Sequence, residues 1–184
     1  MGGCGSGHRY DSMPTVEGCL TLDVNDLWRG GILCWQFDAD KTQTLAWTNT
    51  QTGEEVGSIG YRVQPVEVTW TGSPPPSGPG FRPILQRAVL WLSYRWRDSE
   101  ELDYPITVES TRPHFGGLRY WFRCPILVDG KMPCWRRVGK LHLPRGARRF
   151  GCRQCHGLTY ESSKTAHQFE RLGDAQGRAP ARQN

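Results

Sequence analysis

Four cysteines in the C-terminal third of this 184-residue chain have the spacing of metal ligands. Cys124 and Cys134 form one pair with nine residues between them, and Cys152 and Cys155 form a second pair with only two residues between them. The segment between the pairs predicts a hairpin, with a strand over 137–143, a turn over 144–147 and a return over 148–151, which would bring the pairs together. Because four thiolates satisfy Zn²⁺ completely, we predict a closed, structural zinc site.

Two alternatives to this ligand set stay open at the sequence level. The first pair is spread wider than in a typical zinc knuckle, so the four cysteines could be buried free thiols, or His142 or His156 could replace one of them. Disulfides are a poorer explanation, because the chain has seven cysteines and shows no export signal. The remaining three, Cys4, Cys19 and Cys34, have no ligand spacing. We expect a cytoplasmic protein.

The charge of the chain divides at Thr111. Residues 1–111 carry 8 Lys and Arg against 14 Asp and Glu, whereas residues 112–184 carry 15 against 4. A cationic segment of this kind attracts polyanions, so the predicted contacts with DNA or RNA lie around the cysteines. They are Arg123, Arg136, Arg137, Lys140, Arg145, Arg148, Arg149, Arg153 and Trp135. The alternative is that the basic and acidic parts attract each other within the molecule.

The elements that position these residues are mostly predicted strands. Leu20, Val24 and Leu27 favour a helix of two or three turns that Asp23 caps and Gly30 and Gly31 end. Period-two patterns then predict strands with one buried face. They comprise Leu45 and Trp47, then Ile59, Tyr61 and Val63, then Leu90 to Trp96, then Leu102 to Val108, and finally Leu118 to Cys124. We expect the tryptophans of the acidic part to be core residues.

These patterns predict an α+β, mainly β protein: a small antiparallel sheet with one short helix, followed by a zinc-ribbon hairpin module. The predicted divisions are a flexible glycine-rich arm over 1–14, an acidic β domain over 15–111, a basic zinc-ribbon module over 112–163 and a disordered tail over 164–184. A Pro-rich loop over 72–80 interrupts the β domain, because a run of glycines and prolines like this one cannot pair in a sheet interior.

The chain also resembles a family of small, largely uncharacterised bacterial and mobile-element proteins. The resemblance rests on the Met-Gly-Gly-x-Gly-Ser-Gly start, on the segment Thr15-Val-Glu-x-Cys-Leu20 and on three stretches around the cysteines, 115–125, 134–144 and 150–160. It implies a zinc-ribbon-like C-terminal part, a cytosolic location in bacteria and a prophage or plasmid setting, but no activity. Within it, Trp135 stands where a glycine would suit the turn after a ligand.

Two functions follow from these features. The first is a zinc-containing accessory protein that binds nucleic acid non-specifically or by its structure, with Trp121, Trp135 and Phe150 available for stacking. The alternative is a protein-interaction module, such as an adaptor or inhibitor of a host enzyme. No catalytic motif is present, so we predict no enzyme. No apolar run is long enough for a membrane span, and the sequence leaves the oligomeric state open.

Overall fold

The computed structural model describes residues 13–33, 41–49, 52–69, 84–96 and 100–164. Most of the predicted arm, the Pro-rich loop over 72–80 and nearly all of the predicted tail lie outside these residues. The largest element is a six-stranded antiparallel sheet with the strand order β2-β3-β4-β5-β6-β9. Its strands are β2 (Gln43–Thr48), β3 (Glu55–Thr69), β4 (Ile84–Trp96), β5 (Glu100–Thr111), β6 (Arg119–Arg123) and β9 (Arg137–Val138). The prediction of a mainly β fold with antiparallel sheets is confirmed.

The period-two patterns correctly identify the buried face of this sheet. On β5, Leu102, Tyr104, Ile106 and Val108 are at most 7% exposed, whereas the residues between them are more exposed. Apolar side chains on alternate positions bury one face of a strand because successive side chains point to opposite sides. On β3, a bulge around Pro65 interrupts the register, which accommodates a proline that cannot donate to the ladder.

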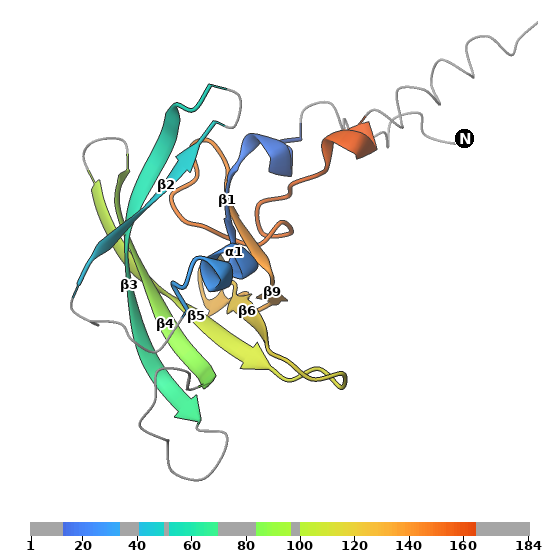
Figure 1. The fold of residues 1–184 in the computed structure, drawn as a ribbon. Helices are drawn as coiled ribbons and strands as arrows, with labels where there is room; N and C mark the ends of the chain where they lie inside the picture. The colour runs from blue at the N-terminus through green and yellow to red at the C-terminus, as the bar shows by residue number, and fades with distance from the viewer. Residues whose placement is uncertain (1–12, 34–40, 50–51, 70–83, 97–99, 165–184) are drawn as a thin grey trace, which may run out of the picture.

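A smaller layer packs on the concave side of the sheet (Figure 1). It consists of a 3₁₀ turn (Val16–Gly18), β1 (Leu20–Asp23), α1 (Val24–Arg29) and β10 (Lys140–Leu143). β1 pairs with β10 in antiparallel register, from Leu20 opposite Leu143 to Asp23 opposite Lys140. Fully buried side chains from this layer, including Leu22, Val24 and Leu141, belong to the same core as those of the sheet.

The predicted helix is present but shorter than expected. The Asp23 carboxylate caps the helix by accepting a hydrogen bond from the Asn25 backbone N–H at 2.8 Å. The helix ends at Gly30, and Gly31 follows in the left-handed region with φ +75°. Leu20 is not helical, because its segment pairs with β10 instead. The helix also packs on β6, where the rings of Trp28 and Tyr120 lie 4.8 Å apart.

The sheet and its core continue across the change of charge at Thr111. β5 precedes this point and pairs with β6, which follows it, with Val108 opposite Phe122. The buried cluster likewise contains residues from both parts of the chain, among them Leu22 and Cys152. The acidic and basic parts therefore share one core, and β1 and β5 together support the segment that carries the cysteines.

The expectation that the tryptophans form the core is met only in part by the residues that the structure describes, where Trp47 and Trp96 are partly buried and pack against the core. None of the described tryptophans is among the buried side chains, and Trp28 is 39% exposed. An indole is large and carries an N–H that needs a partner, which favours a position at the margin of the core. Trp47, for example, donates from Nε1 to the Thr21 carbonyl at 2.8 Å. No helix in the described residues is long and apolar enough to cross a membrane.

Candidate metal centre

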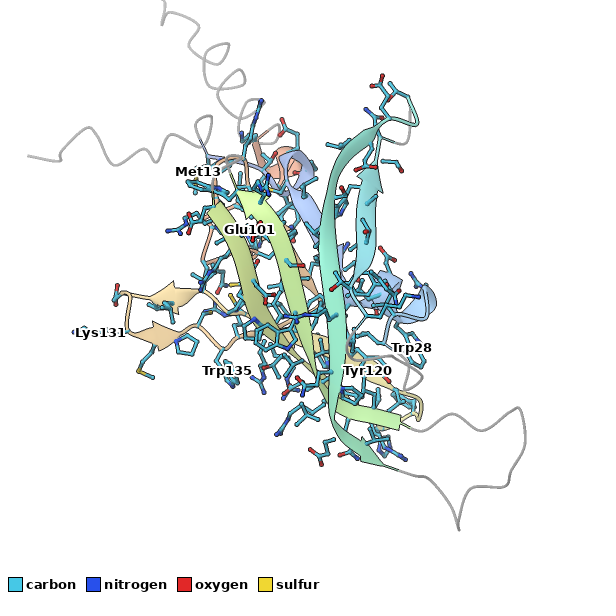
Figure 2. The ribbon with its side chains drawn as sticks, turned by 90° about the vertical axis from the view of Figure 1, so that its left-hand side faces the viewer. Met13, Trp28, Glu101, Tyr120, Lys131 and Trp135 are labelled. Carbon is cyan, nitrogen blue, oxygen red and sulfur yellow. The ribbon has the colours of Figure 1, made fainter. Side chains whose placement is uncertain are left out.

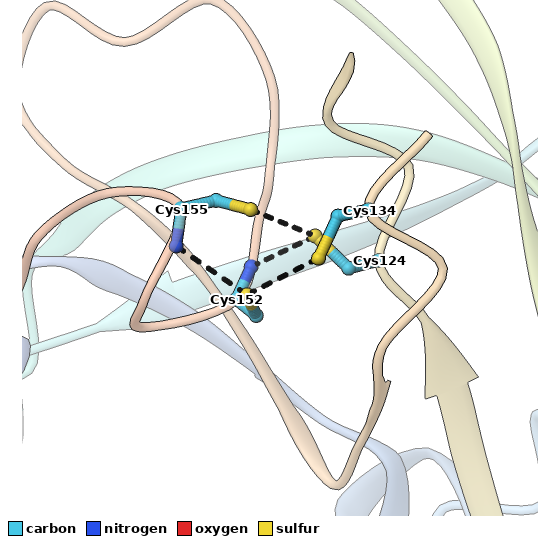
Figure 3. Close-up of side chains that lie close together, drawn as sticks. All are labelled: Cys124, Cys134, Cys152 and Cys155. Carbon is cyan, nitrogen blue, oxygen red and sulfur yellow. Dashed lines mark hydrogen bonds between the residues drawn. The ribbon is translucent and has the colours of Figure 1, made fainter. Parts of the chain in front are cut away.

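The four predicted cysteines converge on one point at the edge of the core (Figure 3). All four Sγ atoms lie within 4.8 Å of one another, with 3.9 Å between Cys124 and Cys155 and 4.0 Å between Cys134 and Cys152. Metal–sulfur bonds of about 2.3 Å in tetrahedral array place neighbouring sulfurs about 3.8 Å apart. A disulfide needs about 2.05 Å, so these are free thiols. The cluster could therefore hold one metal ion.

A small hairpin accounts for the wide spacing of the first pair. β7 (Leu127–Val128) and β8 (Met132–Pro133) pair between Cys124 and Cys134, and Lys131 lies at the tip, away from the sheet (Figure 2). At its base the Cys134 N–H donates to the Ile126 carbonyl at 2.7 Å, and the Trp135 N–H donates to the Cys124 carbonyl at 3.1 Å. The hairpin contains most of the nine residues between Cys124 and Cys134, so these two cysteines lie close together despite their wide spacing in the sequence.

Trp135 has a backbone conformation that favours glycine. Its φ is +55°, in the left-handed region, where a side chain normally costs about 1–2 kcal/mol. The Arg123 guanidinium fixes this turn by donating to the Trp135 carbonyl at 3.0 Å. The sequence had indicated the position correctly, because a glycine would suit the turn after the ligand. The indole is 51% exposed, so the strain is not offset by burial in the core.

The second pair lies in a tight turn whose backbone points at the sulfurs. The Cys155 N–H donates to Cys152 Sγ at 3.4 Å, and the Cys152 N–H donates to Cys124 Sγ at 3.2 Å. The turn closes with the His156 N–H on the Cys152 carbonyl at 3.2 Å and with Gly157 at φ +58°. Hydrogen bonds to a sulfur stabilise its charged form, so this turn favours thiolates.

The chain reverses between the two pairs as predicted, but the predicted return over 148–151 is no strand, and one isolated bridge joins it to β10. The backbone groups of His142 and Gly151 exchange hydrogen bonds of 2.8 and 3.0 Å, and the Ala147 N–H closes the turn on the Pro144 carbonyl at 3.0 Å. The first strand divides into β9 and β10 at Gly139, whose carbonyl accepts from the Val24 N–H at 3.0 Å. The start of α1 therefore helps to place the cysteines.

The thiols differ in acidity because of their surroundings. Burial raises the pKa of Cys124 to about 11 and also raises that of Cys155. Burial acts on Cys152 in the same direction, but hydrogen bonds from the Cys155 N–H and from Arg136 outweigh it and lower its pKa to about 7. Of these three thiols, Cys152 therefore ionises most readily, which makes it available as a thiolate ligand to a metal cation.

Arg136 lies beside the sulfurs. Its Nη1 is 3.6 Å from Cys152 Sγ and 3.8 Å from Cys134 Sγ. The Arg136 carbonyl also accepts from the Cys124 N–H at 3.0 Å, which ties its backbone to the same site. A guanidinium in this position offsets negative charge on the thiolates. Arg136 was predicted as a nucleic-acid contact, but the structure gives it contacts with the cysteine cluster.

Neither histidine that was considered as a substitute ligand belongs to the cluster. In the described part of the chain, the four cysteines are the only group of three or more His, Cys, Asp and Glu side chains close enough to share a metal ion. His142 Nδ1 forms a hydrogen bond with Thr21 Oγ1 at 2.9 Å. His156 is half-buried, and its Nε2 has no partner within the described residues. Burial lowers the pKa of both imidazoles.

Four of the predicted nucleic-acid contacts form ion pairs with the acidic part of the chain. Glu109 of β5 pairs with Arg123, Nε to Oε2 at 3.0 Å, and with Arg137, Nε to Oε1 at 2.9 Å. Lys140 pairs with Asp23 at 3.1 Å, and Arg148 pairs with Glu100. The alternative of internal attraction between the two parts is therefore realised for these four residues. Part of the opposite charge of the two parts is therefore used in ion pairs that join β5 and β1 to the segment that carries the cysteines.

The basic turn, residues 144–149, is held from β4 and β5. Tyr94 Oη donates to the Arg148 carbonyl at 2.6 Å, and Trp96 Nε1 donates to the Ala147 carbonyl at 3.1 Å. Arg149 is exposed and lies over the Tyr104 ring at 5.1 Å. Arg145 is exposed, and within the described residues it has no ion pair or hydrogen bond. These anchoring aromatics had no recognisable signal in the sequence beyond their period-two spacing.

The last predicted contacts lie elsewhere around the cluster. Arg153 donates to the Leu158 carbonyl at 3.2 Å and lies over the Tyr160 ring at 5.2 Å. Trp135 lies at the base of the β7–β8 hairpin, where its N–H donates to the Cys124 carbonyl. Of the nine predicted residues, four form ion pairs with acidic side chains and Arg136 contacts the cysteine cluster. The basic turn combines exposed arginines that have no acidic partner in the described residues, Arg145 and Arg149, with hydrogen bonds from Tyr94 and Trp96.

Comparisons with protein-family models, with curated proteins and with solved structures found no match to this chain. The resemblance to mobile-element proteins stays a prediction.

Proposed function

We propose that the four-cysteine cluster binds one Zn²⁺ as a structural ion, in a module of the zinc-ribbon type. The donor set supports this, because four thiolates at near-tetrahedral separations suit zinc better than the oxygen-seeking cations. Zinc would supply folding energy by joining the segment at the base of the β7–β8 hairpin to the turn at Cys152. With four thiolates bound, no coordination position remains for a substrate, so the proposal assigns no catalytic role.

We propose further that this zinc-stabilised chain binds nucleic acid through its basic turn. The observation that carries the proposal is that Arg145 and Arg149 are exposed, with no acidic partner within the described residues, on a turn that Tyr94 and Trp96 hold rigidly. Exposed arginines on a rigid support suit the phosphate backbone, which dominates the affinity of such proteins. The turn carries no side chain set for base-specific readout, so we expect binding without sequence preference.

The test is fluorescence anisotropy with the zinc-loaded full-length chain and labelled DNA and RNA at two salt concentrations. We expect binding that weakens steeply with salt, because few contacts beyond phosphate contribute. Arg145→Glu with Arg149→Glu removes the proposed contact. Arg29→Glu with Lys131→Glu makes the same change of net charge at exposed positions elsewhere and is the matched control.

The two variants separate the turn from general electrostatics. Loss of binding in the turn variant alone supports the proposal. Equal loss in both variants would show attraction to the overall charge, and unchanged binding in the turn variant would remove the turn from the interface. Thermal unfolding and zinc content measured on the same samples show that each variant is folded.

A second candidate function, contact with a protein partner, is favoured by the β7–β8 hairpin. Leu127, Val128 and Met132 are 49%, 48% and 72% exposed at its tip, which projects from the molecule (Figure 2). Apolar side chains gathered on a projecting hairpin are typical of interaction sites. Replacing Leu127 and Met132 with Ser should abolish a partner complex without affecting zinc or nucleic acid. A complex that survives this change would exclude the hairpin.

A further inference from the structure

A cleft of about 1120 Å³ lies beside the basic turn. Its walls come from the segment before β1, from β3 and β4, and from the turn itself. Its lining includes Glu17, Leu20, Gly57, Tyr94, Trp96 and Arg145. Pockets that take small ligands in proteins have volumes of about 300–1,000 Å³, so this cleft has room for one or more flat rings.

The cleft exists because the sheet does not close on itself. Within the described residues, β2 is an edge strand of the six-stranded sheet, and β1 pairs only with β10, so no strand joins β1 to β2. Gly57 of β3 faces Leu20 at this gap, and a Cβ placed on Gly57 would be in van der Waals contact with the Leu20 Cδ1 at 3.4 Å. The backbone at Gly57 has no positive φ, so a larger side chain would not strain the backbone; it would extend into the cleft or displace the flexible end of Leu20.

The chemistry of the lining suits a nucleotide. Tyr94 and Trp96 offer aromatic surface, and their polar atoms are already bonded to carbonyls of the basic turn, which fixes the rings in place. Arg145 lines the same cleft, and Arg148 and Arg149 follow on the same turn. Aromatic faces beside cations are the recurring means by which proteins hold unpaired bases and their phosphates.

The other charged residues of the cleft have partners. The Glu17 carboxylate accepts from the Glu161 backbone N–H at 3.2 Å, and Arg95 pairs with Glu101 at 3.3 Å. Arg145 is therefore the cation in the cleft without an ion-pair partner in the described residues, and Glu17 is an anion held only by a backbone N–H. A ligand that brings a phosphate to Arg145 and a ring to the aromatic side chains would complement the site.

We propose that this cleft binds single-stranded nucleic acid, with an unpaired base against Tyr94 and Trp96 and its phosphate on Arg145. The inference rests on the proposed nucleic-acid binding at the basic turn and adds that the bound form is single-stranded. Bases in a duplex are stacked and paired, so their faces are not available to a cleft. The cleft thus selects unpaired nucleotides, while the arginines of the turn contribute to binding either form.

The test compares a labelled twelve-nucleotide single strand of oligothymidine with a duplex of the same length, using the zinc-loaded full-length chain. Gly57→Phe fills the cleft without changing any charge. Val66→Phe places the same ring on an exposed position of β3 outside the cleft and serves as the control. We expect the Gly57 variant to bind the single strand at least tenfold more weakly, the loss typical of one base stack, and to bind the duplex as before.

A second measurement is independent of how well the Gly57 variant folds. Cys19 lines the cleft, so alkylation of its thiol in the unchanged protein, mapped by mass spectrometry, should slow when the oligothymidine is bound. Equal affinity for single strand and duplex, or unslowed alkylation of Cys19, would overturn the inference. If the Gly57 variant binds the single strand normally and the Arg145/Arg149 variant does not, the cleft proposal fails while the turn remains the interface.

Two further outcomes would also decide the matter. If no nucleic acid binds at low salt, both the cleft proposal and the proposed function fail. If the Gly57 variant keeps nucleic-acid binding but loses a protein that co-purifies with the unchanged chain, the cleft holds a peptide segment, and the inference is wrong.

Discussion

Glu109 is the residue whose replacement tests most sharply how the acidic and basic parts are joined. Its carboxylate on β5 pairs with Arg123 on β6 and with Arg137 on β9, so one side chain links three strands next to the cysteine cluster. Glu109→Gln keeps the shape and removes the charge. Two guanidiniums that the carboxylate now neutralises would then lie side by side without a counterion.

The expected loss of stability follows from the exposure of the three side chains, 17% for Glu109, 23% for Arg123 and 46% for Arg137. Breaking a fully buried ion pair costs about 3–5 kcal/mol, whereas exposed pairs contribute about 0–1 kcal/mol. This network lies between those limits, so we expect a loss of about 2 kcal/mol, roughly a thirtyfold change in the folding equilibrium.

Urea denaturation of the zinc-loaded protein measures this loss directly. Glu101→Gln is the control, because Glu101 also pairs with an arginine of its sheet, but its side chain is 83% exposed. We expect the control to lose less than about 0.5 kcal/mol. Equal, small losses in both variants would refute the reasoning, because they would show that the Glu109 network does not hold β5, β6 and β9 together. The freed arginines should also raise the affinity for nucleic acid.

Three further substitutions probe the cluster. Cys152→Ser should abolish the binding of one zinc ion per chain. Where zinc is about a thousandfold above its dissociation constant, the free energy of unfolding should fall by about 4 kcal/mol. A variant that keeps one zinc ion and unfolds at the native temperature would exclude Cys152 as a ligand. Arg136→Ala should speed zinc transfer to a coloured chelator about tenfold, the effect of one hydrogen bond to a charged group, whereas Arg137→Ala should not. Trp135→Gly should keep the metal and raise the unfolding temperature by relieving the left-handed backbone; a lower temperature would show that the indole contributes more than the strain costs.

Local patterns in the sequence were sufficient for the features that depend on neighbouring residues. The period-two pattern of Leu102 to Val108 identified a buried strand face, and Asp23 identified the cap of α1. The strand face and the cap are each set within a short stretch of chain, where side-chain direction and turn geometry are determined by position along the backbone. The spacing of the cysteines also identified the four thiols that lie together, although α1 and β5 help to place them.

Pairing between distant segments could not be predicted in the same way. The contact of β1 with β10 joins residues more than a hundred positions apart, and nothing in Leu20 or Leu143 specifies the other. The sequence showed that the two parts of the chain carry opposite charge, but it did not show which arginines form ion pairs with acidic residues. Arg123 and Arg137 pair with Glu109 only because β5, β6 and β9 are adjacent in the sheet. The cleft beside Gly57 is present because β1 and β2 do not pair with each other. The absence of a pairing between two distant segments leaves no pattern in the local sequence.

We propose that Cys124, Cys134, Cys152 and Cys155 jointly bind one structural zinc ion. Native mass spectrometry of the full-length protein, followed by alkylation with and without a chelator, measures whether they do. We expect one Zn²⁺ per chain, with these four cysteines protected until the chelator removes the metal. A folded protein without zinc, or one whose four thiols react at the same rate with and without the chelator, would contradict the account.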